Sequence, residues 1–340
     1  MRYFSNLRTS FLNFSVLLLC IQPVWSQDPP CTTRKLPVSF RDSQNLPLQN
    51  ISITDLEAKL HGRPVKIVSL APDPRPRRLV LILATSGSIG SIEGEPALWN
   101  LELSLAWHFF EANRERAKIA MLFFGDEVHD VTDFAQGNAA VGEKLRQVSE
   151  DSKYVKKQIK GRTALRDAIF QGIQLLDHPS SADAVYVMTD GGDNSSHQSA
   201  SELDRHLAVT SVRLFAVVLY PKLGNRRQAP EEVSGPQELA EIAQRSGGEI
   251  LTAAQWHGKN VALSANAESK VKSEETLERL YQAIVQNSLL EVELPFPISK
   301  SERWELKLSS AARRQWKNAK ITDPDTLVSC YAEVFGLDHN

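Results

Sequence analysis

The side chains best suited to chemistry lie in three short polar segments, each beside a strongly patterned stretch of the chain. Residues 85–88 (TSGS) follow an apolar run that ends at Ala84. Residues 161–163 (GRT) precede a helical pattern, and Asp190 follows the apolar run 184–189. In a doubly wound sheet, ligands bind outside the carboxyl ends of the strands. Hydroxyl and carboxylate groups at or beside such ends therefore predict one composite site.

A catalytic interpretation of these hydroxyls has weaker support. Ser86 or Ser88 could be a hydrolase nucleophile, yet neither stands in a Gly-x-Ser-x-Gly turn. No spacing ties a histidine to these serines, and we expect His129, His197 and His206 at ordinary surface or loop positions. Phosphate-loop, dinucleotide-binding and His/Cys zinc patterns are also absent from the sequence. We therefore expect a non-enzymatic protein, with a hydrolase as the alternative.

Near-continuous apolar runs alternate with helical patterns along the middle of the chain. Such runs are typical of strands buried on both faces of a mostly parallel sheet. They lie at residues 79–84, 118–125, 184–189, 212–220 and 249–253. Between them apolar residues recur at helical spacing, and Ser199 forms a capping box with Glu202. The alternation predicts a doubly wound α/β domain over residues 77–288.

Further features complete this layout. The turn at residues 125–127 (GDE) leads into residues 128–134 and predicts one antiparallel edge strand. Residues 27–76 and 289–340 contain alternating apolar residues, which predict small N- and C-terminal β segments on either side of the domain. The Pro-rich, basic stretch 71–78 marks the connection into the domain. The two flanks could pack together as a small accessory layer.

Taken in order on strand and helix ends, the three polar segments resemble the von Willebrand factor A domain and its metal-ion-dependent adhesion site. The resemblance spans about residues 77–288, and the flanks also look like those of secreted bacterial members of the family. In that family, an Asp-x-Ser-x-Ser sequence after the first strand, a Thr before a helix and an Asp after a later strand hold a divalent ion. The resemblance implies hydroxyl ligands from Ser86, Ser88 and Thr163 and a carboxylate ligand from Asp190.

The sequence departs from the family pattern at Ala84, which stands where the first Asp of Asp-x-Ser-x-Ser is expected. Its loss removes one of the site's two carboxylates, so we expect at most weak binding of Mg²⁺ or Mn²⁺. Glu93, Asp167 or Asp193 could replace it, but no spacing requires this, and we expect Asp193 to be a solvated loop acid. In the alternative without a metal, the hydroxyls cap helices and hydrogen-bond Asp190.

The composition and the first residues predict where the protein works. A chain of 340 residues with 42% hydrophobic and 24% charged residues has an ordinary globular composition. Its net charge of −2 argues against broad nucleic-acid binding. Arg2 and Arg8 precede a short apolar run at 11–21 that ends near Ser26, which is typical of a secretory signal peptide over residues 1–26. We expect a secreted or periplasmic protein with no membrane span.

The predicted signal peptide also determines how the three cysteines are interpreted. Cys20 lies inside the predicted signal peptide. A lipoprotein is the second interpretation, after a secretory signal peptide, because Leu19 is bulkier than the small residue that is typical of lipoprotein cleavage sites. Cys31 and Cys330 would stay in the mature chain, and an oxidising compartment favours a disulfide between them. Two unpaired thiols are the alternative.

Together these features predict an exported, non-enzymatic protein of the von Willebrand factor A type. It would recognise an unknown protein or surface ligand, but no nucleic acid, through the loops at the C-terminal edge of its sheet. Ala84 would weaken any metal dependence of this recognition. Two alternatives stay open: a hydrolase that uses Ser86 or Ser88, and a purely structural domain whose site is vestigial.

Overall fold

In the computed structural model the elements described below all belong to one unit, Thr32–Asn340. The described residues are 32–43, 46–48, 50–89, 97–159, 161–181, 183–220, 230–256, 260–264, 281 and 286–329. The predicted signal peptide, Cys31, Cys330 and Glu93 lie outside these residues. Within the described residues, no helix has the length and apolar character needed to cross a membrane.

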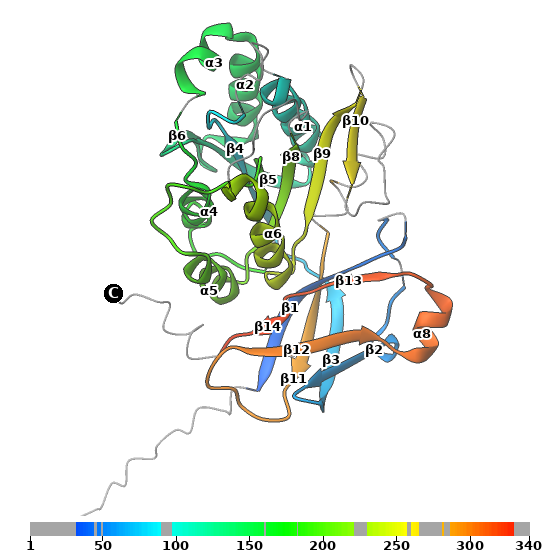
Figure 1. Ribbon diagram of the computed structural model, residues 1–340. Coiled ribbons are helices and arrows are strands. Elements are labelled where there is room, and N and C mark those ends of the chain that lie inside the picture. Colours follow the sequence, from blue (N-terminus) through cyan, green and yellow to red (C-terminus); the bar gives the residue numbers. More distant parts are fainter. Residues whose placement is uncertain are drawn as a thin grey trace, which may run out of the picture. The chain divides into compact units, whose positions relative to one another are not determined.

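The first of two sheets has the strand order β10-β9-β8-β7-β4-β5-β6 (Figure 1). Its strands are β4 Arg77–Ala84, β5 Ala117–Phe124, β6 Val128–Thr132, β7 Ala184–Thr189, β8 Arg213–Tyr220, β9 Ile250–Trp256 and β10 Asn260–Ser264. The five strands from β9 to β5 pair in parallel. The two edge strands, β6 and β10, pair antiparallel with their neighbours, so the sheet is mixed.

The predicted antiparallel edge strand is present as β6, but the prediction of a single such strand was wrong. β10 pairs antiparallel with β9, with Asn260 opposite Trp256. The connection between them is only residues 257–259, which is far too short for a parallel crossover, so the chain returns as a hairpin. A five-residue strand of this kind has too little periodicity to be identified from its sequence alone.

Helices pack on this sheet in two groups. They are α1 Ala97–Asn113, α2 Gly137–Glu150, α3 Ser152–Gln158, α4 Leu165–Gln174, α5 Ala200–Thr210 and α6 Pro230–Arg245. α1 contacts α2, whereas α5 contacts both α4 and α6. The side chains of β4, β5 and β7 are almost all buried, because a parallel sheet covered by helices on both faces has no solvated side. This explains the continuous apolar runs in the sequence.

The two flanks of the chain build a second sheet, with the order β13-β1-β11-β3-β2-β12-β14. Its strands are β1 Thr33–Arg41, β2 Leu56–Leu60, β3 Arg63–Pro72, β11 Ser288–Glu293, β12 Glu302–Leu308, β13 Lys320–Thr322 and β14 Thr326–Leu327, and two short helices, η1 Ile53–Asp55 and α8 Ser310–Gln315, accompany them. Every pairing in it is antiparallel.

This second sheet is larger than the small accessory layer that the sequence suggests for the two flanks. β1 pairs with β11 and β2 pairs with β12, so strands from the two ends of the chain interleave. Leu60, Leu290 and Trp304 belong to a hydrophobic cluster distinct from the one around the parallel strands. The flanks therefore form one sheet with its own core.

Ser199 begins α5 with the capping box that the sequence predicts. Its hydroxyl oxygen accepts a hydrogen bond from the backbone N–H of Glu202, whose carboxylate accepts one from the backbone N–H of Ser199. Ser199→Ala leaves one of the first helical N–H groups without this partner, so we expect it to lower the free energy of unfolding by about 1 kcal/mol in urea denaturation. Ser234→Ala, at an exposed position within α6, is the control and should change it little. Equal effects would contradict the capping role.

Candidate functional site

The three polar segments meet at the C-terminal edge of the parallel strands. The loop after β4 contacts the segment before α4, where the backbone N–H of Gly87 donates to the carbonyl oxygen of Gly161 at 3.3 Å. That segment in turn contacts the loop after β7, because the carbonyl oxygen of Thr163 accepts from the N–H of Asn194 at 3.0 Å and of Ser195 at 3.1 Å. Backbone hydrogen bonds thus fix the three loops to one another.

The predicted ligands lie within these joined loops. The hydroxyls of Ser86 and Ser88 are hydrogen-bonded to each other at 3.0 Å, with Ser86 buried and Ser88 half-buried. Thr163 is buried, and its backbone N–H donates to the side-chain oxygen of Asn194 at 3.0 Å. Asp190 is also buried, and one of its carboxylate oxygens accepts from the N–H of Gly192 at 3.4 Å. These contacts place all four at the same edge of the sheet.

Glu102 is a residue of this site that the sequence reasoning missed. It lies on α1 and is fully buried. Its Oε1 accepts a hydrogen bond from the backbone N–H of Ala84 at 2.7 Å, at the position whose aspartate is missing. Burial raises the pKa of the Glu102 carboxyl well above its usual range, the hydrogen bond from Ala84 opposes this, and the charge of Asp190 raises it further. The feature of the sequence that could have identified Glu102 is its position as an acid within the apolar face of a predicted helix.

Asp193 is not the solvated loop acid that we expected, because the exposed fraction of its side chain is only 6%. One of its carboxylate oxygens, Oδ2, accepts hydrogen bonds from the backbone N–H of Arg166 at 2.8 Å and from the hydroxyl of Ser196 at 2.7 Å. The other faces the Arg166 guanidinium at 3.5 Å. Asp193 therefore holds its own loop against the first turn of α4.

Asp167 has a similar structural role on α4. Its carboxylate accepts hydrogen bonds from the backbone N–H groups of His197 and Gln198, both at 2.9 Å, and contacts the His197 ring at 3.0 Å. Burial raises the pKa of the Asp167 carboxyl, but these hydrogen bonds outweigh it and leave the pKa below its usual value. Like Asp193, this acid is already engaged by the loop after β7.

His129 takes part in a hydrogen-bonded chain that we did not expect from its spacing. Its Nε2 lies 2.9 Å from the Thr85 hydroxyl, and its Nδ1 lies 3.2 Å from the Asp130 carboxylate. Asp130 also accepts from Lys144 at 2.8 Å and from the Tyr154 hydroxyl at 2.9 Å. The order hydroxyl, imidazole, carboxylate is that of an activated nucleophile. Thr85 is fully buried, however, so the chain holds β6 against the loop after β4.

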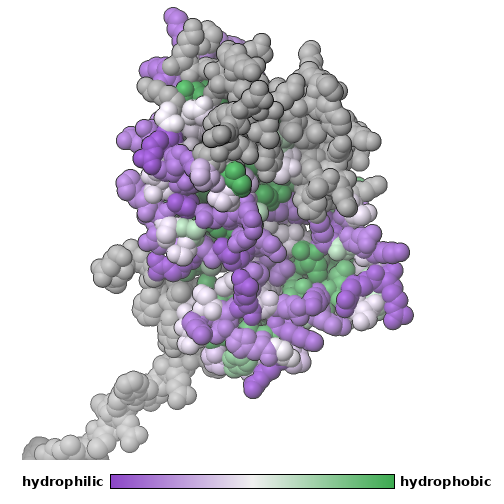
Figure 2. Space-filling model, in the orientation of Figure 1, coloured by the Kyte–Doolittle hydropathy of each residue, from purple (hydrophilic) through white to green (hydrophobic). Residues whose placement is uncertain are grey.

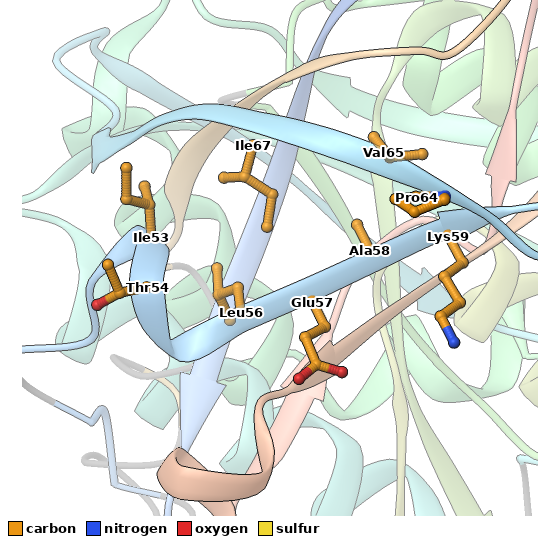
Figure 3. Close-up of a pocket in the computed structure, with 9 residues that line it drawn as sticks. All are labelled: Ile53, Thr54, Leu56, Glu57, Ala58, Lys59, Pro64, Val65 and Ile67. Atoms are coloured by element: carbon orange, nitrogen blue, oxygen red, sulfur yellow. The ribbon is translucent and has the colours of Figure 1, made fainter.

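A concave surface of another kind lies on the second sheet, where η1, β2 and β3 line a groove of about 450 Å³ (Figure 3). The side chains of Leu56 and Ile67 extend towards each other across it. Those of Glu57 and Lys59 extend to the other side of β2. The groove offers apolar contact area, and none of its lining residues belongs to the loop site.

The remaining surface gives no second strong signal. Figure 2 shows a mainly hydrophilic face with only small hydrophobic patches. Among the residues that the structure describes, the exposed large hydrophobic side chains are Ile53, Val68, Trp107, Val131 and Val233. They lie on several different elements, as is normal for single exposed apolar residues. The joined loops at the C-terminal edge of the parallel strands are therefore the best candidate site.

The central part of the chain has an α/β fold like that of the von Willebrand factor A domain. Residues 79–192, about a third of the chain, match the family model described as the von Willebrand factor type A domain. A comparison with curated proteins found no match.

Solved structures with a similar fold include three bacterial proteins. The conserved hypothetical protein BatB from Bacteroides thetaiotaomicron is 14% identical, with 61% of this chain and 96% of that chain covered and a TM-score of 0.40. The PilB minor pilin from Streptococcus sanguinis is 12% identical, with 63% and 62% covered and a TM-score of 0.40. A von Willebrand factor type A protein from Catenulispora acidiphila is 13% identical, with 88% and 75% covered and a TM-score of 0.39.

Proposed function

We propose that the protein is exported and recognises a protein or surface ligand through the joined loops at the C-terminal edge of its parallel strands. The observation that supports this most directly is the set of backbone hydrogen bonds from Gly87 to Gly161 and from Asn194 to Thr163. They hold loops from three different elements in one fixed arrangement, which lowers the entropy lost on binding. The match to the von Willebrand factor type A domain supports a recognition role.

The exposed part of these loops is polar, and it combines the positive charge of Arg162 with the nearby acids Glu231 and Asp126. Gly87, Arg162 and Asn194 are exposed, while the serine, threonine and aspartate side chains lie beneath them. The Arg162 guanidinium donates a hydrogen bond to the carbonyl oxygen of Asn194, which keeps this charge beside the joined loops. Arg162 is the group on this surface that could attract an acidic group of a partner. We therefore propose an acidic protein or surface ligand, with no role for nucleic acid.

We also propose that the protein is not an enzyme. The Ser86 hydroxyl contacts that of Ser88, whereas the imidazole of His129 contacts Thr85, so the imidazole is not paired with either serine. Thr85 is fully buried and out of reach of a substrate. The alternatives are a hydrolase that uses Ser86 or Ser88 and a purely structural domain, and turnover of simple esters would favour the hydrolase.

Charge reversal at the centre of the loops tests the recognition role. We expect Arg162→Glu to weaken capture of a partner from an extract of the cell envelope by tenfold or more, because it repels the acidic group that Arg162 would attract. Binding to the immobilised protein would be measured by quantitative mass spectrometry, with unfolding curves to show that the variant is folded. Arg314→Glu, at an exposed position on α8, is the matched control and should leave capture unchanged. Equal capture by both variants would refute the loop surface as the binding site.

A further inference from the structure

The carboxylate of Glu102 contacts the backbone of the residue at which the family pattern loses a carboxylate. Position 84 carries no carboxylate, and the backbone N–H of this same residue donates to Glu102 Oε1 at 2.7 Å. An aspartate at position 84 would project its carboxylate from the α-carbon next to this N–H. Glu102 approaches this position from α1, and its carboxylate is close enough to Asp190 for the charge of Asp190 to act on it.

The second oxygen of Glu102 has no partner in the described structure. Glu102 Oε2 is buried and forms no hydrogen bond with any described residue. A buried carboxylate oxygen without a partner is costly, and such atoms in native proteins often mark an ion or water that completes the site. This orphaned oxygen lies in a site whose other groups are also oxygens, which is the ligand type that Mg²⁺ and Mn²⁺ prefer.

We propose that Glu102 replaces the carboxylate missing at Ala84, and that Glu102 and Asp190 bind one Mg²⁺ or Mn²⁺ together with the Ser86 and Ser88 hydroxyls. When a cation displaces the proton that burial favours on Glu102, the two carboxylates supply two negative charges, which matches a divalent ion, whereas Asp190 alone supplies one. The two serine oxygens lie 3.0 Å apart, close enough to bind the same ion. Gly87 and Ser88, the less buried residues of the β4 loop, give the ion its access from solvent.

This inference concerns the same loops as the proposed function, and its biological meaning rests on that function. A bound cation would supply a Lewis-acidic centre that attracts an acidic group of the partner. It would also explain why a fully buried acid is retained in the apolar face of α1 beside Ala84. The expectation of weak metal binding, which counted Asp190 as the remaining carboxylate and did not consider Glu102, is replaced by the expectation of a complete site.

Calorimetric titration of the chelator-treated full chain with MnCl₂ and with MgCl₂ tests the proposal. We expect saturable binding of one Mn²⁺ per chain, and Glu102→Gln should weaken it by about a hundredfold, which corresponds to about 2.7 kcal/mol. Glutamine keeps an oxygen for the Ala84 N–H but removes the charge. Glu111→Gln, on the same helix and paired with Arg114, is the matched control and should bind Mn²⁺ as the unaltered protein does. No binding by the unaltered protein at millimolar Mn²⁺, or equal binding by Glu102→Gln, would overturn the proposal.

A rescue variant separates loss of the ligand from damage to the fold. In the Glu102→Gln protein, Ala84→Asp puts a carboxylate back at the family position, and we expect it to restore most of the Mn²⁺ affinity. If Glu102→Gln proves unstable in circular dichroism, Asp190→Asn provides a second test and should weaken binding by a similar factor. Unchanged Mn²⁺ affinity in Asp190→Asn would overturn the proposal.

The outcomes also distinguish this inference from the proposed function. If Mn²⁺ does not bind while Arg162→Glu still abolishes partner capture, the metal site is wrong and the recognition surface stands. If Mn²⁺ binds through Glu102 while capture ignores Arg162→Glu, the metal site stands and the recognition surface is wrong.

Discussion

Gly248→Ala is expected to destabilise the protein by about 3 kcal/mol or more, although it adds a single methyl group. Gly248 follows α6, and its backbone N–H donates to the carbonyl oxygen of Ala243 at 2.9 Å. A Cβ atom at this position would lie 1.8 Å from the carbonyl oxygen of Leu214 and 2.6 Å from its carbonyl carbon. These are backbone atoms of the central strand β8, so no side-chain rotation can relieve the clash. The chain between α6 and β9 would have to move.

Urea denaturation of Gly248→Ala and Gly62→Ala separates this clash from the general cost of replacing glycine. Gly62 has a φ angle of +76°, and a Cβ atom there would meet no other atom within 4 Å, so its replacement adds only backbone strain, about 1 kcal/mol. Gly248→Ala should lose clearly more than Gly62→Ala. Similar losses in the two variants would mean that the approach of Gly248 to β8 is not close in solution.

Much of the parallel sheet could be predicted from the sequence because each central strand is buried on both faces. Burial on two faces forces a nearly continuous apolar run, and such runs are visible without any tertiary information. The capping box at Ser199 is equally local, since its donor and acceptor lie three residues apart. The buried strands and the capping box depend on residues close together in the sequence, and the structure contains them at the predicted positions.

The second sheet could be predicted only in part because its pairing is not local. Alternation of apolar residues identifies individual strands, but nothing in it states that Leu36 will lie opposite Leu290, or Leu60 opposite Trp304. Such partners are fixed by packing of a core that is shared between segments far apart in the sequence. The sequence therefore indicated β structure at both ends and underestimated the sheet that they form together.

The loop site shows the same division. Convergence of the loops after β4 and β7 follows from parallel strands ending at one edge, so the positions of Ser86 and Asp190 could be expected. The contact between Glu102 and Ala84 depends on how α1 crosses the end of β4, and the contact between His129 and Thr85 depends on the register of the β5–β6 hairpin, in which His129 lies opposite Phe123. Neither contact can be predicted from the spacing of residues in the sequence.

Asp323 is expected to make the stability of the protein fall as the pH rises towards and through neutrality. It lies in the turn between β13 and β14, and this turn is attached to β12 because the Trp304 N–H groups donate to the carbonyl oxygens of Asp325 at 3.1 Å and Pro324 at 2.5 Å. Burial, together with the nearby charge of Asp325, raises the pKa of the Asp323 carboxyl to about 7. The folded protein thus holds a proton on Asp323 at pH values where the unfolded chain has lost it.

The sign of the effect follows from proton binding. Below the ordinary aspartate pKa of about 3.9, Asp323 is protonated in both the folded and the unfolded state, so it does not lower the free energy of unfolding. Between that value and about 7 the folded state binds more protons than the unfolded chain, so each increase in pH lowers the free energy of unfolding. Above this range the full penalty applies. Its upper bound is about 4 kcal/mol, and contact of the carboxyl with solvent reduces it to about 2 kcal/mol.

Asp323→Asn removes the titration and keeps the shape of the side chain. We expect this variant to be more stable than the unaltered protein at pH 8.5, and the difference should shrink as the pH falls through 7 towards 4, in urea denaturation at each pH. Asp325→Asn retains Asp323 but removes the like charge beside it, so it should move the midpoint of the pH-dependent loss to lower pH without abolishing it. A difference between Asp323→Asn and the unaltered protein that is the same at pH 4 and pH 8.5 would show that Asp323 ionises normally in the folded chain. The turn would then be open to solvent, since burial is the largest cause of its raised pKa.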